Sequence, residues 1–121
     1  MEFEFKKQTP LEKRIEQFKK IEKDFPNKVP IILERSQKCT INKIIKTKYI
    51  LSSELTMSEF IKIIREKLEI EPERALFFLA NGKYSLSGSE DLAQVYEKYR
   101  DNEDGFLYLI SYNSFYSYII K

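Results

Sequence analysis

The residue types that could carry catalysis are sparse in this chain of 121 residues. Cys39 is the single cysteine and there is no histidine, which excludes Ser-His and Cys-His catalysis and any zinc site that needs imidazole. Paired carboxylates such as Glu71 and Glu73 are more typical of a solvated helix flank than of general acid–base chemistry. The chain has no glycine-rich phosphate loop, no paired-cysteine motif and no calcium-loop spacing. The sequence therefore predicts a protein that is not an enzyme and that needs no cofactor and no metal.

The charges of the chain are nearly balanced but unevenly placed. Lysine and arginine number 21 against 19 acidic residues, a net charge of +2 that is too small for general nucleic-acid binding. From Lys6 to Lys48 there are 13 basic and 5 acidic residues, whereas from Glu71 to Lys121 there are 5 basic and 8 acidic ones. The basic half suits acidic partners, and a solvated lysine-rich surface is the alternative explanation.

The length and composition predict a single domain. One cysteine cannot form an intrachain disulfide, which is typical of a reducing compartment. No apolar run approaches the 18 or so residues of a membrane span, and Met1 to Phe5 does not read as a signal peptide. We therefore expect a cytoplasmic protein.

Capping signals predict where the helices begin. Thr9-Pro10-Leu11-Glu12 predicts a long helix with Thr9 as its cap, which Phe25-Pro26 ends, and a short helical arm from Phe3 to Gln8 precedes it. Similar boxes at Thr56–Glu59 and Ser87–Glu90 predict two further helices. The residues expected to face inward are Leu11, Ile15, Phe18 and Ile21 in the first long helix, Phe60, Ile63, Ile64 and Leu68 in the second, and Leu92, Val95, Tyr96 and Tyr99 in the third.

Apolar and β-branched runs predict the strands. They are Val29–Arg35, Lys48–Leu51, Ala75–Ala80, a brief strand near Lys83–Leu86 after the Asn81-Gly82 hairpin signal, and Phe106–Ser111. Because Ala75–Ala80 is apolar at every position, we expect a central strand buried on both faces rather than an RNA-binding sheet surface. The order α, then β-β-α-β-β-α-β, predicts an α+β domain with the pattern of the ubiquitin-like β-grasp.

The strand Lys48–Leu51 is the best candidate for binding. Alternation sends Lys48 and Ile50 to one face and Tyr49 and Leu51 to the other. The strand is short and flanked by Lys46, which is typical of a charge-protected edge strand. Such an edge can accept an extended peptide as an added strand, although an ordinary strand has the same pattern.

Several separate motifs together resemble the autophagy ubiquitin-like modifiers, the family of GABARAP, microtubule-associated light chain three and autophagy-related protein eight. The resemblance extends from Phe3 to about Tyr108. It rests on Pro10-Leu11-Glu12-Lys13-Arg14, Phe25-Pro26-Asn27-Lys28-Val29-Pro30-Ile31-Ile32, Lys48-Tyr49-Ile50-Leu51, Leu55-Thr56, Phe60, Ile64-Arg65, Ala75-Leu76-Phe77-Phe78 and Gly105-Phe106-Leu107-Tyr108.

The resemblance implies a β-grasp domain at 28–111, preceded by a helical extension at 1–27 with two helices. Residues 112–121 form an aromatic tail. The resemblance also implies binding of short aromatic-x-x-aliphatic motifs, often preceded by acidic residues, in autophagy receptors and machinery. By matching positions, a first pocket for the aromatic residue would be lined by Ile21, Pro30, Ile32, Lys48, Ile50 and Phe106. A second pocket, for the aliphatic residue, would be lined by Tyr49, Leu51, Leu55, Phe60 and Ile63, and the acidic residues would meet Lys28, Lys46 and Lys67.

The tail departs from the family pattern. Lipid conjugation by the family's E1-like and E2-like enzymes needs a glycine shortly after the last strand, and this chain has none after Gly105. We therefore expect no conjugation of this chain, and membrane or autophagosomal localisation only if it is conjugated or tethered. The alternatives are a lipid-conjugated modifier with an atypical or differently processed C-terminus, and a ubiquitin-like scaffold whose groove is unused.

Overall fold

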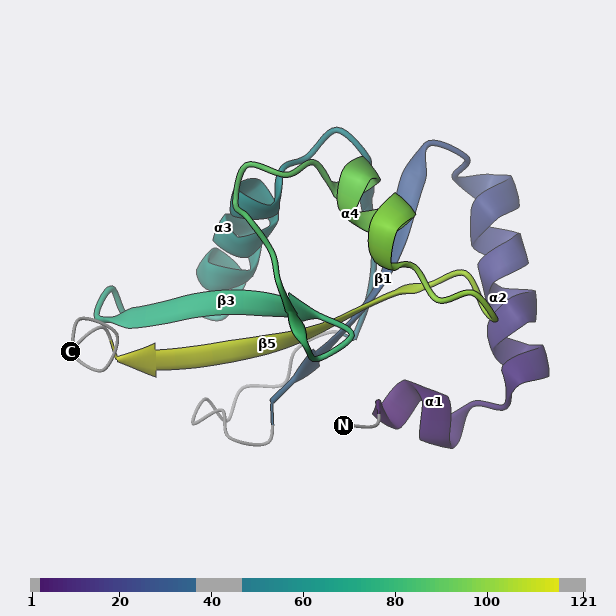
Figure 1. The fold of residues 1–121 in the computed structure, drawn as a ribbon, viewed down its shortest axis with the longest axis horizontal. Helices are drawn as coiled ribbons and strands as arrows, with labels where there is room; N and C mark the ends of the chain where they lie inside the picture. The colour runs from purple at the N-terminus through teal and green to yellow at the C-terminus, as the bar shows by residue number, and fades with distance from the viewer. Residues whose placement is uncertain (1–2, 37–46, 116–121) are drawn as a thin grey trace.

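The computed structural model describes residues 3–36 and 47–115, with side chains as far as Tyr112 (Figure 1). Its elements follow the predicted order: α1 (Glu4–Gln8), α2 (Leu11–Asp24), β1 (Lys28–Arg35), β2 (Lys48–Ser52), α3 (Met57–Lys67), β3 (Arg74–Ala80), β4 (Tyr84–Ser85), α4 (Leu92–Tyr99) and β5 (Leu107–Phe115). The strands form one sheet in the order β2-β1-β5-β3-β4, in which β1 and β5 are parallel and the other neighbours are antiparallel. The predicted α+β architecture is confirmed.

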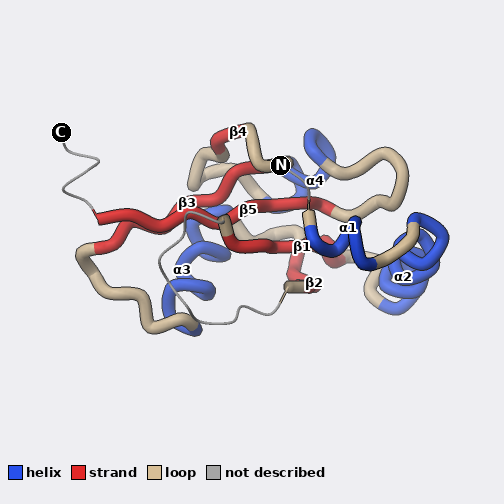
Figure 2. The backbone as a smooth tube through the Cα atoms, turned by 90° about the horizontal axis from the view of Figure 1, so that it is seen from below, coloured by secondary structure: helices blue, strands red, loops and turns tan. Residues whose placement is uncertain are grey.

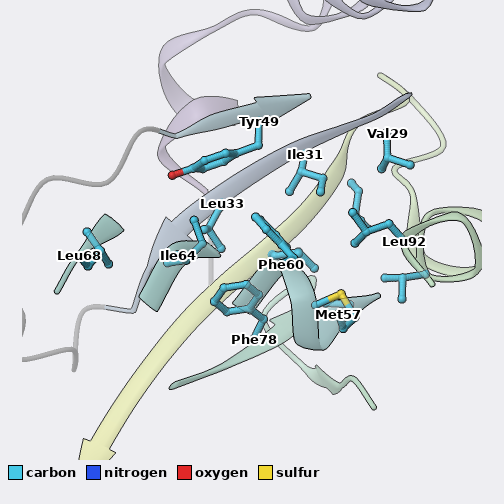
Figure 3. Packing of buried hydrophobic residues seen from close by; sticks show 14 residues of the cluster. Val29, Ile31, Leu33, Tyr49, Met57, Phe60, Ile64, Leu68, Phe78 and Leu92 are labelled. Atoms are coloured by element: carbon cyan, nitrogen blue, oxygen red, sulfur yellow. The ribbon is translucent and has the colours of Figure 1, made fainter. Parts of the chain in front are cut away.

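Each face of the sheet carries its own hydrophobic cluster. The α3-side cluster lies between the sheet and helices α3 and α4, and within it the Phe60 ring meets Tyr49 and Phe78 edge to face at centroid distances of 5.7 and 5.2 Å (Figure 3). The α2-side cluster lies under the N-terminal helices and comprises Phe3, Ile21, Ile32, Phe106, Tyr108 and Ile110.

A buried ion pair connects the N-terminal helices to the sheet. Arg14 Nε donates to Asp104 Oδ2 at 2.9 Å, and the two side chains are 9% and 0% exposed. The same carboxylate accepts the hydroxyl of Tyr108 and the backbone N–H of Phe106, the latter at 2.9 Å. Arg14 Nη1 donates to the carbonyls of Lys6 and Thr9 at 3.2 and 2.8 Å. Both charged groups thus have further hydrogen-bond partners, which a buried ion pair needs in order not to destabilise the fold.

The buried arginine changes the expected face of α2. Of the apolar stripe, only Ile21 is buried, whereas Leu11, Ile15 and Phe18 are half-buried. Thr9 is not the cap that was predicted, because Pro10 occupies the N-cap position without a side-chain hydrogen bond. The Thr9 carbonyl instead accepts a hydrogen bond from Arg14. This contact takes the place of the predicted cap by the Thr9 side chain.

The other two helix starts have different outcomes. The predicted box at Thr56 is confirmed, because Glu59 N–H donates to Thr56 Oγ1 at 3.2 Å and Thr56 N–H donates to Glu59 Oε1 at 3.0 Å. The predicted box at Ser87–Glu90 is wrong. Those two residues close a turn by a 2.9 Å hydrogen bond, and α4 begins later, with Asp91 as its N-cap residue.

The strands β3 and β5 also differ from the prediction. Phe77, expected to be buried, is 41% exposed, because the buried members of the α2-side cluster in β5 end at Ile110 and Phe77 lies opposite the half-buried Tyr112. The last strand does not end at Ser111 but continues to Phe115, which pairs with Arg74. The Tyr112 ring stacks on Phe77 with centroids 5.7 Å apart, so part of the expected tail belongs to the sheet.

The buried ion pair predicts a large loss of stability when one partner is removed. Arg14→Met leaves the Asp104 carboxylate buried beside an apolar side chain, so the free energy of unfolding should fall by about 3–5 kcal/mol. Lys13→Met is the matched control, because Lys13 forms an exposed pair with Glu16 at 3.7 Å and should change stability by less than ~1 kcal/mol. Denaturant unfolding measures both, and equal effects would contradict the role given to Arg14.

Candidate functional site

The strand β2 lies at an open edge of the sheet, as predicted (Figure 2). Leu33 N–H donates to the Thr47 carbonyl at 2.8 Å, so in the antiparallel register the residues Tyr49 and Leu51 also exchange hydrogen bonds with β1. The backbone groups of Lys48 and Ile50 consequently point away from the sheet. They are the donors and acceptors that an added strand would use.

Pro30 fits this register for a definite reason. It lies opposite Ile50, in a pair that exchanges no hydrogen bonds with β2. The missing N–H of proline therefore costs the β1–β2 ladder nothing. The nitrogen of Pro30 faces β5 instead, where the paired register begins one residue later, at Ile31 and Leu107.

The side chains of β2 alternate between the two clusters. Ile50 packs against the α2-side cluster, whereas Tyr49 and Leu51 belong to or pack against the α3-side cluster. The alternation predicted from Lys48 to Leu51 is confirmed. The outward-facing backbone groups of β2 thus have one apolar cluster on each side.

The residues predicted for the first pocket come together in part. Ile21, Ile32 and Phe106 belong to the α2-side cluster. Ile32 and Phe106 are fully buried, so they can form only the floor beneath Ile50. Pro30 is buried in β1 and Lys48 is half-buried.

Two side chains near Lys48 were missed by the sequence analysis. Lys48 Nζ donates to Gln17 Oε1 and lies 5.4 Å from the centroid of the Phe5 ring. Burial lowers the pKa of the Lys48 ammonium below its ordinary value. Gln17 could have been found, because it precedes Ile21 by four residues and therefore shares its helix face. Phe5 carried no such signal, because the turn between α1 and α2 sets its position.

The residues predicted for the second pocket lie in β2, in α3 and in the segment between them. Tyr49 and Phe60 are buried and in contact, whereas Leu51, Leu55 and Ile63 are half-buried. Phe60 is 0% exposed and therefore supports the surface from below. An apolar partner side chain at this end would meet Leu51 and Leu55 first.

The predicted cationic residues are spread along the edge. Lys67 Nζ lies 5.6 Å from the Tyr49 ring centroid, on the α3 side. Lys28 is exposed at the start of β1, opposite Ser52 and four residues along the ladder from the Ile32–Lys48 pair. Lys46 and the single cysteine, Cys39, lie outside the described residues.

The fold and the edge strand define a ubiquitin-like protein with an N-terminal helical extension. The family model for "Autophagy protein Atg8 ubiquitin like" matches residues 13–118. This chain belongs to the Atg8 family of autophagy proteins. The resemblance noted in the sequence and the ubiquitin-like fold are both confirmed.

Relatives from distant organisms agree with this assignment. The chain is 35% identical over 109 residues to Autophagy-related protein 8 of Candida glabrata, covering 90% of this chain and 91% of the relative. It is 32% identical over 105 residues to Autophagy-related protein 8d of Arabidopsis thaliana, covering 87% and 86%. The crystal structure of Trypanosoma brucei ATG8 superposes with a TM-score of 0.87 at 30% identity, covering 95% of this chain and 97% of that one.

Membership of the Atg8 family also indicates whether the protein is an enzyme. Atg8 proteins are ubiquitin-like modifiers and adaptors that interact with the autophagy machinery, and this protein is not an enzyme. Among the residues that the structure describes, no group of three or more acidic or cysteine side chains could hold a metal ion. In the same part of the chain, no helix is long and apolar enough to span a bilayer.

The contact between Lys48 and Phe5 predicts a measurable titration change. Phe5→Ala should expose the Lys48 ammonium to water and raise its pKa toward the ordinary 10.5. Titration of the lysine side-chain carbons by NMR follows this shift, with the exposed Lys23 as an internal control. A pKa of Lys48 that does not respond to Phe5→Ala would show that the ring does not desolvate the ammonium.

Proposed function

We propose that this protein is an autophagy adaptor that binds short aromatic-x-x-aliphatic motifs by adding them as a strand beside β2. The observation that carries the proposal is the open edge at Lys48 and Ile50, whose backbone groups point outward between two apolar layers. The partners would be motifs in autophagy receptors and machinery. Membership of the Atg8 family supports the pathway.

The two layers suggest how such a motif would lie. Its aromatic residue would approach Ile50 and Lys48 above the α2-side cluster, and its aliphatic residue would approach Leu51 and Leu55 on the α3 side. Residues three apart in an extended peptide lie about 10 Å apart, which two neighbouring sites along one strand can accommodate. Acidic residues before the aromatic would meet lysines, for which Lys28, Lys46 and Lys67 are the proposed contacts.

The proposed affinity is moderate. Burial of one aromatic and one aliphatic side chain contributes roughly 1.5–3 kcal/mol each, and a few backbone hydrogen bonds add to this. Ordering of a flexible peptide offsets much of the gain. We therefore expect dissociation constants of about micromolar order.

We further propose that these 121 residues act without conjugation through a glycine. No glycine follows Gly105, and Gly105 has a structural role: its φ is +87°, and a Cβ there would lie 2.8 Å from the Phe18 ring. Cleavage at Gly105 would also remove β5, the strand between β1 and β3. As these 121 residues, the chain would be cytoplasmic and would reach autophagosomal membranes through a partner. A lipid-conjugated modifier with different processing is the competing proposal.

The strand-addition proposal predicts local changes on peptide binding. A peptide with acidic residues before Trp-x-x-Leu should shift the amide resonances of Lys48 to Leu51 in an NMR titration. Leu51→Ala should weaken binding about tenfold through lost apolar burial. Lys48→Glu should weaken it more at low salt than at high salt, because salt screens the attraction or repulsion between this half-buried side chain and the acidic residues of the peptide.

Lys98→Glu is the matched control, because it makes the same charge change on the exposed face of α4. It should leave the affinity nearly unchanged. The absence of shifts at Lys48 to Leu51 with millimolar peptide would favour the scaffold with an unused groove.

The conjugation proposal has a biochemical test. With the family's E1-like and E2-like enzymes, the 121-residue chain should form no thioester and no lipid adduct, because β-branched Ile119 and Ile120 and the charged Lys121 replace the flexible glycine. Ile119→Gly with deletion of Ile120 and Lys121 should restore at least partial thioester formation. Mass spectrometry detects both products, and a lipid adduct on the unaltered chain would overturn the proposal.

A further inference from the structure

A second candidate site lies at the other edge of the sheet from β2. It is an open cavity of about 650 Å³ between α1, the β3–β4 turn and the segment that follows α4. The volume falls in the range of small-molecule sites. None of the described residues that line it belongs to the proposed peptide site.

Three cationic side chains from three parts of the chain line this cavity. They are Lys6 of α1, Lys83 of the β3–β4 turn and Arg100 just after α4. Asp101 is the only carboxylate among the residues that the structure places in the lining. The described lining residues therefore carry a net charge of +2, which favours an anionic ligand.

The single carboxylate is already engaged. Asp101 Oδ2 accepts from Lys6 Nζ at 2.6 Å, and Oδ1 accepts the backbone N–H groups of Glu103 and Asp104 at 2.8 and 3.0 Å. Burial alone would raise the pKa of Asp101, but these hydrogen bonds outweigh it and lower the pKa. Asp101 thus holds Lys6 in place. Among the described residues Lys83 and Arg100 have no ion-pair partner, and the Arg100 guanidinium lies 5.6 Å from the Tyr96 ring centroid.

The backbone holds the other lining groups in fixed positions. Asn81 and Gly82 have φ angles of 54° and 75°, the left-handed pair of a tight hairpin turn, and Asn81 N–H donates to the Tyr108 carbonyl at 2.8 Å. This turn positions Lys83 and Tyr84 in the lining of the cavity. Tyr84 is 49% exposed and stacks on Tyr99 with centroids 5.3 Å apart, which leaves an aromatic wall beside the cations.

We propose that this cavity binds a phosphate ester, with Lys83, Arg100 and Lys6 around the phosphate and Tyr84 beside the group it carries. Lysine and arginine both form charge-assisted hydrogen bonds with phosphate oxygens. The side-chain amides of Asn81 and Asn102 add neutral polar groups to the lining, and Asn81 Nδ2 also donates to the Tyr99 carbonyl at 3.4 Å. The phosphate could belong to a soluble nucleotide or to a lipid headgroup, and the two sources share this chemistry.

NMR titration of the full chain at constant ionic strength tests the proposal with two probes, ADP and vesicles that contain phosphatidylinositol 4-phosphate. Saturable shifts at Lys83, Tyr84 and Arg100 to Asn102 with either probe support it, and the probe that binds identifies the source. The double variant Lys83→Gln with Arg100→Gln should weaken binding at least about tenfold.

The double variant Lys23→Gln with Lys62→Gln is the matched control, because it removes the same charge from exposed positions on α2 and α3. It should bind as the unaltered chain does. Equal weakening by both double variants would reveal general charge attraction and overturn the proposal. The absence of localised shifts with both probes would overturn it as well, and neither result bears on the peptide site at β2.

Discussion

The buried pair of Arg14 and Asp104 is the interaction on which the placement of the N-terminal helices depends. Two charges taken out of water destabilise a fold unless each is fully hydrogen-bonded. Here the carbonyls of Lys6 and Thr9 accept hydrogen bonds from Arg14. The Tyr108 hydroxyl and the Phe106 N–H donate hydrogen bonds to the Asp104 carboxylate. The pair therefore holds the turn between α1 and α2 and the start of β5 in one arrangement. With α2 so placed, Ile21 covers Ile32 and Phe106 and completes one side of the candidate peptide site.

The sheet order then determines which surfaces remain for partners. Because β2 is the terminal strand of the described sheet and pairs there with β1, the backbone groups of Lys48 and Ile50 face outward. The opposite edge ends in the two-residue β4, whose short turn leaves room for the cationic cavity beside α1. An edge strand with an apolar layer on each side suits an extended peptide, whereas a concave cationic site suits a small anion. The two sites differ in shape and in chemistry, so they can be tested separately.

Much of the fold and part of the candidate site could be predicted from local patterns. The Thr56 box, the Asn81-Gly82 turn and the alternation from Lys48 to Leu51 depend on neighbouring residues, and the structure contains each of them. Phe77 was misplaced because its exposure depends on how far the N-terminal helices reach across the sheet. Gln17 shares the helix face of Ile21, but its contact with Lys48 joins residues 31 apart in the sequence and has no local signal.

The sequence by itself determined the element order, the absence of imidazole chemistry, the lack of a glycine after Gly105 and the faces of the β2 strand, since composition and short-range periodicity are local properties. Only the tertiary structure decided that Arg14 is buried against a carboxylate 90 residues later and that β5 continues to Phe115 beside β3. It also decided that Lys6, Lys83 and Arg100 share one cavity. These contacts join residues far apart in the chain, and their free energy depends on desolvation and packing that exist only after the layers have assembled.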